Sequence, residues 1–280
     1  MTRTTHTLPS GDELPALGLG TWNIGGETVK ESVRAALDAG YTHVDTAEGY
    51  RNEREIGTVL EEHDRDRDDL FLTSKVLPKH LNYDSLVGAC EASLERLGTD
   101  YLDLYLVHWP NPAVSLRETL DAMATLSERG LVRNVGVSNF SAYQLSCAHH
   151  VTDVPIAVNQ IEFHPWLQRP ALVDYCRETD TVVEAAAPLA RTEIFEDEVV
   201  QELAATYEKS PAQVVINWAL ERDVVVLPKS SSPDHVRANA ETDWTMDDDD
   251  LRRLDGRDRD RPVYDTPARD WTSDTYGINQ

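Results

Sequence analysis

The sequence predicts an α/β protein whose residues 1–280 form a single (β/α)8 TIM barrel preceded by a short β-hairpin. Three observations predict this fold. The chain has 280 residues, enough for one such barrel. Short apolar runs alternate with segments of helical periodicity roughly every 30 to 40 residues. No exact repeat or low-complexity linker divides the chain. A doubly wound open sheet is the main rival architecture.

The hairpin is predicted at "HTLPSGDELPAL", residues 6–17, where Ser10 and Gly11 can make the turn. The predicted strands are the apolar runs that follow it. There are eight, at 16–21, 42–46, 70–76, 101–108, 132–138, 156–162, 181–187 and 224–229. Helix-like windows lie between them, several opened by Asp, Ser or Pro at a capping position. These windows are 27–39, 53–63, 83–97, 115–129, 141–150, 170–179, 196–207 and 211–221.

Polar side chains gather at one end of the predicted strands. The strand ends carry Asp45, Lys75, His108, Ser138 with Asn139, Gln160, and Lys229 with Ser230. The strand starts are instead Thr42, Leu70, Val132 and Val224. Because active sites of such barrels lie at the carboxyl ends of the strands, this asymmetry favours a site there.

The stretch "THVDTAEGYRNE", residues 42–53, places Asp45 at a strand end and Tyr50 five residues later. A buried Asp needs a partner, and Lys75 on the next predicted strand can supply it. An ammonium about 4 Å from a phenol can lower the phenol pKa by up to about three units, before desolvation of the phenol subtracts its share. Asp45 would then hold Lys75, Lys75 would prepare Tyr50 to donate a proton near neutral pH, and His108 would hydrogen-bond a substrate oxygen.

Seven motifs occur in order: "GLGTW", "HVDTAEGYRNE", "LTSKV", "YLDLYLVHWP", "VGVSNF", "VNQIEFHP" and "LPKSSSPDHVRAN". Over residues 15–240 the chain therefore resembles the aldo-keto reductases, particularly the compact prokaryotic members similar to 2,5-diketo-D-gluconate reductase. The resemblance implies a barrel that binds NADPH across its mouth without a Rossmann domain. It also implies hydride transfer from the nicotinamide to a carbonyl carbon, with the tyrosine protonating the oxygen.

The resemblance carries over to individual positions. Asp45, Tyr50, Lys75 and His108 match the catalytic tetrad of the family. The positions that match its cofactor contacts are Ser138, Asn139, Gln160, Leu189, Lys229, Ser230, His235 and Asn239. Trp22 and Trp109, together with His108, match the substrate pocket. The alternative for Ser138 and Asn139 is helix capping, and that for the tryptophans is packing in the core.

Two departures from the family pattern concern the cofactor. Ala186 stands where the family usually carries an aromatic residue that stacks on the nicotinamide. His235 stands where an arginine usually packs on the adenosine, with Arg237 two positions on. Lys229 favours NADPH as the cofactor, with NADH possible. Near the C-terminus, Trp271 and Tyr276 either cover the pocket as a lid or fray.

The predicted function is that of an NADP(H)-dependent oxidoreductase that reduces aldehyde or ketone carbonyls to alcohols, with Tyr50 as general acid. One alternative is an isomerase or aldolase that uses Lys75 as a Schiff base, but Asp45 would keep that lysine charged. Another is a non-catalytic, cofactor-sensing module such as those associated with ion channels. The intact tetrad and the lack of an obvious partner-binding extension argue against the latter.

Metal and disulfide sites are not predicted. His149 and His150 are adjacent and would point in different directions from a helix, with no carboxylate at ligand spacing. The three cysteines (Cys90, Cys147 and Cys176) form no C-x-x-C pair and indicate small core residues.

The charge and hydropathy of the chain indicate which partners and which cellular location to expect. The formal net charge is −24 and the pI is about 4.6, which argues against nucleic acid as a partner. The sequence contains no apolar run of about 18 residues and begins without the apolar region of a secretory signal. We therefore expect a cytoplasmic monomer or small homo-oligomer with a small-molecule carbonyl substrate and no membrane partner. Acidic runs such as "EEHDRDRDDL" suggest a halophilic protein; an ordinary acidic protein is the alternative.

If the acidic surface is an adaptation to salt, the melting temperature should rise between about 0.01 M and 1 M KCl. Over that range the Debye length falls from about 30 Å to about 3 Å, which screens the repulsion among the carboxylates. Differential scanning calorimetry at several KCl concentrations measures the effect. A melting temperature that stays flat or falls would contradict the halophilic interpretation.

Overall fold

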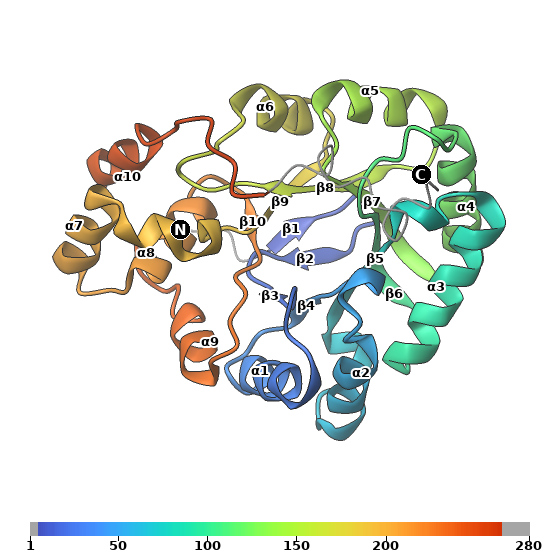
Figure 1. The fold of residues 1–280 in the computed structure, drawn as a ribbon, viewed down its shortest axis with the longest axis horizontal. Helices are drawn as coiled ribbons and strands as arrows, with labels where there is room; N and C mark the ends of the chain where they lie inside the picture. The colour runs from blue at the N-terminus through green and yellow to red at the C-terminus, as the bar shows by residue number, and fades with distance from the viewer. Residues whose placement is uncertain (1–4, 265–280) are drawn as a thin grey trace, which may run out of the picture.

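A computed structural model describes residues 5–264, and residues 1–4 and 265–280, including Trp271 and Tyr276, lie outside this description. Eight parallel strands form one curled sheet in the order β3-β4-β5-β6-β7-β8-β9-β10, and the helices surround it (Figure 1). The strands are β3 Leu19–Gly20, β4 His43–Asp45, β5 Phe71–Val76, β6 Leu102–Val107, β7 Val132–Ser138, β8 Ile156–Glu162, β9 Val182–Ala186 and β10 Val225–Val226. This confirms the predicted barrel; that residues 1–280 form a single domain stays a prediction.

The barrel closes between its first and last strands. Leu17 bridges Val226 and Gly20 bridges Lys229, both in the parallel sense. The Gly20 N–H donates to Pro228 O over 3.1 Å. A Cβ atom on Gly20 would lie 2.9 Å from the Leu227 carbonyl oxygen, so the close approach requires glycine here. This closure excludes the doubly wound open sheet.

The helices cover the outside of the sheet. They are α1 Gly26–Asp38, α2 Glu53–Glu62, α3 Tyr83–Leu97, α4 Leu116–Glu128, α5 Ala142–Val151, α6 Pro170–Glu178, α7 Glu198–Tyr207, α8 Pro211–Leu220, α9 Pro233–Asn239 and α10 Asp248–Asp255. The first eight match the predicted windows within two residues. Capping boxes begin α5 at Ser141 and α8 at Ser210. The sequence prediction missed α9 and α10, which are short and rich in charged or polar residues.

The N-terminal hairpin closes one end of the barrel. Strands β1 Thr5–Thr7 and β2 Glu13–Pro15 pair antiparallel and lie across the centre of the barrel (Figure 1). Residues 8–12 make the turn, with Gly11 at φ 90°, as predicted. Leu8 and Leu14 are buried in one cluster with residues of β5, β6, β8 and β10. Burying these apolar side chains stabilises the barrel at its strand-start end.

Polar side chains also occur near the strand starts, so the predicted asymmetry between strand ends and starts is incomplete. Asp103 in β6 accepts the Leu72 N–H over 2.9 Å and pairs with Arg67 over 2.7 Å. Asn134 in β7 donates to Asp12 Oδ2 over 2.7 Å. These contacts tie the strands to one another and to the hairpin loop, which is a structural role.

Among the described helices, none combines the length and the apolar character that crossing a membrane requires.

His43 lies inside the barrel with no exposed surface, where its ring packs edge-on against Phe71 and its Nε2 lies 3.0 Å from Thr73 Oγ1. Burial lowers the pKa of His43 to about 3, and the positive charge of Lys75 adds to the effect. The unfolded chain therefore binds one more proton than the folded chain between pH 6.5 and 3. His43 stabilises the fold fully above about pH 6.5, and this contribution is lost as the pH falls.

We expect His43 alone to lower the free energy of unfolding by up to about 1.4 kcal/mol per pH unit below about pH 6.5. His43→Gln should flatten this slope even if it lowers stability overall. Urea unfolding at pH 5, 6 and 7 in 1 M KCl measures the effect with surface repulsion screened. The exposed His150→Gln is the control and should keep the wild-type slope; an equal slope in all three proteins would disprove the assignment.

Candidate active site

The position of Tyr50 depends on the turn that follows β4. A short 3₁₀ helix, Glu48–Tyr50, begins three residues after Asp45, and Arg51 ends it in the left-handed conformation. The Tyr50 N–H donates to Ala47 O over 2.9 Å. Glu48 anchors the turn, because its carboxylate accepts the Leu77 N–H over 3.1 Å. The chain thus turns back at once and places the phenol over the end of the barrel.

Lys75 has no exposed surface and lies at the centre of the site. Its Nζ lies 2.7 Å from both carboxylate oxygens of Asp45 and 2.8 Å from the Thr46 carbonyl oxygen. It also lies 3.4 Å from the Tyr50 hydroxyl. The predicted partnership of Asp45 with Lys75 is therefore present, and the structure brings the tyrosine within reach of the same ammonium.

The expectation that Lys75 lowers the pKa of Tyr50 is not met. Burial, with the negative charge of Asp45 as the second cause, raises the pKa of Tyr50 well above its ordinary value. Asp45 accepts two hydrogen bonds from the Lys75 ammonium and compensates the charge of that group. Burial of the phenol therefore outweighs the attraction of Lys75 for the phenolate. The phenol therefore remains protonated at neutral pH.

His108 completes the four-residue cluster. Its ring packs edge-on against Tyr50, with 5.5 Å between ring centroids. Burial lowers the pKa of His108 to about 3, with a further contribution from the charge of Lys75. The imidazole is therefore neutral at physiological pH. Its Nδ1 is buried and makes no hydrogen bond within residues 5–264.

A cavity of about 260 Å³ opens beside Tyr50 and Asp45. The predicted site residues that line it are Trp22, Asp45, Tyr50, Gln160, Leu189 and Lys229. Gln160 is held from behind, because its Nε2 donates to Asp45 Oδ2 over 2.9 Å. Ala186 lines the same cavity. The structure therefore brings residues from six segments of the chain to one cavity.

The remaining predicted residues lie beside or beyond this cavity. Lys75 and His108 do not line it, but both contact Tyr50. Ser138 is buried at the end of β7, and Asn139 follows it at φ 63°. The Asn139 Nδ2 donates to His108 O over 2.9 Å and to Ser138 Oγ over 3.0 Å. Trp109 is partly buried.

The predicted adenosine-phosphate contacts lie at and before α9. The Ser230 hydroxyl donates to Ser232 O over 3.3 Å and accepts the Ser232 N–H over 3.1 Å. His235 is exposed and Asn239 is buried at the end of the helix. Arg237, considered as a substitute for the missing arginine, is exposed and pairs with Asp234 over 2.9 Å.

Arg191 and Tyr264 were missed by the sequence analysis, although both line the cavity. The Arg191 guanidinium lies 5.0 Å from the Trp22 ring centroid and 5.5 Å from that of Tyr264. Glu162 anchors the segment, since its carboxylate accepts the N–H groups of Val263 and Tyr264 over 2.5 and 3.1 Å. No sequence signal marks this contact. An aromatic ring thus borders the cavity that Ala186 lines, although it comes from another part of the chain.

The chemistry of this cavity fits an anionic ligand with a polar end. Arg191 and Lys229 are both cationic, and neither forms an ion pair with another described residue. In a chain of net charge −24, cations without carboxylate partners at a cavity favour binding of phosphate groups. Gln160 offers an amide at the same cavity. The residues present therefore suit a dinucleotide.

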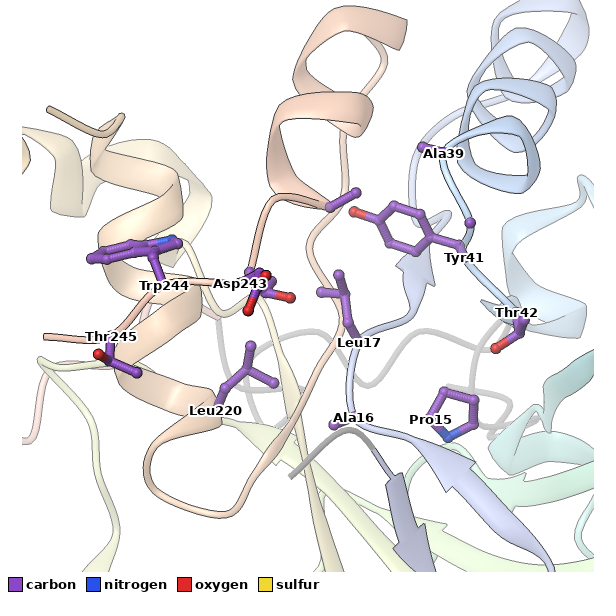
Figure 2. A pocket seen from close by; sticks show the side chains of 13 residues that line it. Pro15, Ala16, Leu17, Ala39, Tyr41, Thr42, Leu220, Asp243, Trp244 and Thr245 are labelled. Carbon is purple, nitrogen blue, oxygen red and sulfur yellow. The ribbon is translucent and has the colours of Figure 1, made fainter. Parts of the chain in front are cut away.

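A second cavity, of about 760 Å³, lies near the starts of β3 and β4 (Figure 2). Its lining includes one carboxylate, Asp243, and no lysine, arginine or histidine. It lacks a cluster of groups that could carry chemistry, so the smaller cavity is the candidate active site. Within residues 5–264, no group of three or more His, Cys, Asp or Glu side chains could hold a metal ion.

Comparison with known proteins bears on this site. The model of the aldo/keto reductase family matches residues 16–259. An aldo-keto reductase of Mycolicibacterium smegmatis is 40% identical over 234 residues, which are 83% of this chain and 85% of that protein. The glyoxal reductase of Bacillus subtilis is 37% identical over 265 residues, 94% and 96% of the two chains.

A solved structure is similarly close. The crystal structure of MGS-M4, an aldo-keto reductase from a Medee basin deep-sea metagenome library, superposes with a TM-score of 0.90 at 34% identity. The match covers 92% of this chain and 97% of that one.

We expect Asp45→Asn to lower the free energy of unfolding by about 3 to 5 kcal/mol, because it leaves the buried Lys75 ammonium without its carboxylate. The double variant Asp45→Asn with Lys75→Met should be less destabilised than the two single changes added together, since it removes both charges. Urea unfolding of all four proteins gives the coupling energy. A cost below about 1 kcal/mol for Asp45→Asn would show that the pair does not stabilise the fold.

Proposed function

The chain belongs to the aldo/keto reductase family and is an NAD(P)H-dependent oxidoreductase, and from this premise we propose that it reduces aldehyde or ketone carbonyls with NADPH while Tyr50 donates the proton. One observation carries the proposal. A protonated phenol and a buried Asp45–Lys75 pair meet beside a cavity with two cations, Arg191 and Lys229, that pair with no carboxylate within residues 5–264. This combination joins an acid to an anion-binding surface.

Tyr50 acts as the general acid in this proposal. Because its pKa is raised, it keeps its proton until the carbonyl oxygen develops negative charge, and an alkoxide is more basic than a phenolate. Lys75 stabilises the phenolate that forms, since its ammonium already lies 3.4 Å from the hydroxyl oxygen. Asp45 fixes the position of Lys75. The tyrosine thus needs a nearby cation during transfer rather than a low pKa in the resting protein.

His108 orients the substrate. A neutral imidazole donates one hydrogen bond without carrying a charge, and the edge-on packing of its ring against Tyr50 keeps the two side chains adjacent. Two donors converging on one carbonyl oxygen stabilise the charge that develops there. The aromatic walls of the substrate pocket are Trp22 and Trp109, and Tyr264 lines the same cavity as Trp22.

NADPH is the proposed cofactor, and it supplies the hydride when it is bound. Gln160, Ser138 and Asn139 hold the carboxamide, and Arg191 and Lys229 attract the phosphates. Leu189, Ser230, His235 and Asn239 complete the proposed contacts. Lys229 favours binding of the extra phosphate of NADPH. The exposed His235 and the ion-paired Arg237 contribute less to binding that phosphate, so NADH is the second candidate.

The substrate is a small carbonyl compound in this proposal. A relative that is 37% identical bears the name glyoxal reductase, and the cavity of about 260 Å³ suits a small molecule beside a bound nicotinamide. A Schiff base on Lys75 is disfavoured, because its Nζ makes three contacts with oxygen atoms at 2.7 to 2.8 Å. Such an ammonium has no free lone pair. The cytoplasmic location, the salt adaptation and the oligomeric state stay predictions.

We expect Tyr50→Phe to lower kcat for aldehyde reduction by about 10²- to 10⁴-fold, the usual contribution of general acid catalysis. The Kd for NADPH should stay within about threefold, because the ring remains and only the hydroxyl group is lost. The rate of NADPH oxidation with a panel of aldehydes, in low and high salt, gives kcat. Fluorescence titration with NADPH gives Kd.

Tyr105→Phe is the matched control. Tyr105 is fully buried in β6, and its hydroxyl has no hydrogen-bond partner among the described residues. Removing that hydroxyl should leave turnover unchanged. A Tyr50→Phe enzyme that reduces aldehydes at the wild-type rate would refute the assigned role. A wild-type protein that binds NADPH but reduces no carbonyl compound would instead favour the non-catalytic alternative.

A further inference from the structure

Glu184 is a carboxyl group enclosed in the barrel that the proposed mechanism does not use. It lies in the middle of β9 and has no exposed surface. Its Oε2 accepts a hydrogen bond from Gln160 Nε2 over 2.9 Å. Its Oε1 makes no hydrogen bond with any described residue, although His43 Nε2 lies 3.9 Å away.

The same Gln160 nitrogen serves two carboxyl groups. It donates to Glu184 Oε2 and to Asp45 Oδ2, each over 2.9 Å. Two acceptors on one side fix the NH₂ group there, because a flipped amide would set its oxygen against the Asp45 carboxylate. The amide oxygen of Gln160 is then the atom left for a ligand in the cavity, which Gln160 lines. Glu184 and Asp45 together therefore orient this amide.

The groups that face Glu184 determine its charge. His43 and Asp45 face it from β4, Lys75 from β5 and Gln160 from β8, while β10 places Val225 opposite it. Burial raises the pKa of Glu184 to about 8, and the negative charge of Asp45 adds to the rise against the opposing effects of Gln160 and Lys75. At neutral pH the group is a neutral acid. Above about pH 8 it carries a second negative charge next to Asp45.

We propose that Glu184 is a positioning residue that makes the cofactor preference of this cavity depend on pH: protonated, it orients Gln160, and ionised, it favours the cationic nicotinamide of NADP⁺ over the neutral ring of NADPH. The inference rests on the proposed function in that the cavity binds the nicotinamide. It follows from the geometry, because one hydrogen bond separates Glu184 from a side chain that lines the cavity. A negative charge enclosed in the barrel is little screened by salt and attracts a cationic ring.

The test measures binding, not turnover. Dissociation constants for NADPH and NADP⁺ are determined by fluorescence titration between pH 6.5 and 9.5. The phosphate groups are common to both nucleotides, so their titration cancels in the ratio Kd(NADPH)/Kd(NADP⁺). In the wild type this ratio should rise by about four- to sixteenfold, as expected for unit charges about 10 Å apart at an effective dielectric of about 20 to 40.

Glu184→Gln keeps an acceptor for Gln160 and carries no charge, so its ratio should stay near the wild-type value at pH 6.5. Asp103→Asn is the matched control, because Asp103 is a buried carboxyl group at the opposite end of its strand from the cavity. Its ratio should rise as in the wild type. A wild-type ratio that does not change with pH, or an equal rise in Glu184→Gln, overturns the inference.

A second measurement keeps the inference testable if Glu184→Gln folds poorly. Glu184 binds its proton more tightly in the folded chain than in the unfolded chain, so it should make wild-type stability fall as the pH rises from about 4.5 to about 8. Glu184→Met should lack this contribution in urea unfolding, and an unchanged pH dependence of its stability overturns the inference. If either measurement gives the contrary result while the protein still binds NADPH, the inference about Glu184 is refuted and the proposed function is not. A wild-type protein that binds neither nucleotide refutes the proposed function as well.

Discussion

The ammonium group of Lys75 has no exposed surface, and the structure around the candidate site compensates its charge. Asp45 meets it with both carboxylate oxygens, and the Thr46 carbonyl supplies a third acceptor. A buried charge of this kind is tolerated only when it is paired and hydrogen-bonded. Asp45 in turn accepts from Gln160. The need to satisfy one cation thus ties β4, β5 and β8 together at the mouth of the barrel.

The chain is strongly acidic as a whole, whereas the candidate active-site cavity is lined by cationic side chains. Carboxylates dominate the chain, which carries a net charge of −24, and most described arginines pair with them. Arg191 instead lies close to the rings of Trp22 and Tyr264, and Lys229 lines the same cavity. Anionic ligands would be repelled by the surface at a distance but attracted at the cavity. Salt screens the long-range repulsion by the surface but leaves close contacts in the cavity largely intact.

Local strain helps to build the same cavity. Ala187, Ala190, Arg191 and Thr192 all have positive φ, between 45° and 73°. Residues other than glycine adopt this conformation at a cost, and such strain is concentrated at functional sites. The loop after β9 bends sharply here and brings Arg191 over the cavity. Nothing in "APLARTEI" indicates four left-handed residues in six positions, so this arginine could not be placed at the cavity from the sequence.

Glu184 could have been recognised from the sequence as a candidate site residue. A single carboxylate within the apolar strand "TVVEAAA" was a visible signal of a buried ionisable group, since Glu is rarely enclosed without a reason. The pKa of Tyr50 shows a different limit. The attraction of Lys75 could be foreseen from the motif, but the balance between that attraction and burial depends on how deeply the phenol is enclosed. Depth of burial is a property of the folded chain.

By itself the sequence determined the alternation of strands and helices, the hairpin, and the polar groups at the strand ends, because apolar periodicity and capping residues record local burial and hydrogen bonding. Asp45, Lys75 and Tyr50 were found in this way. The tertiary structure alone decided that Tyr264, 214 positions from Tyr50, lines the same cavity. It also decided that one amide nitrogen of Gln160 joins Asp45 to Glu184. Contacts of this kind arise when the barrel closes and brings distant segments together, which no local pattern can encode.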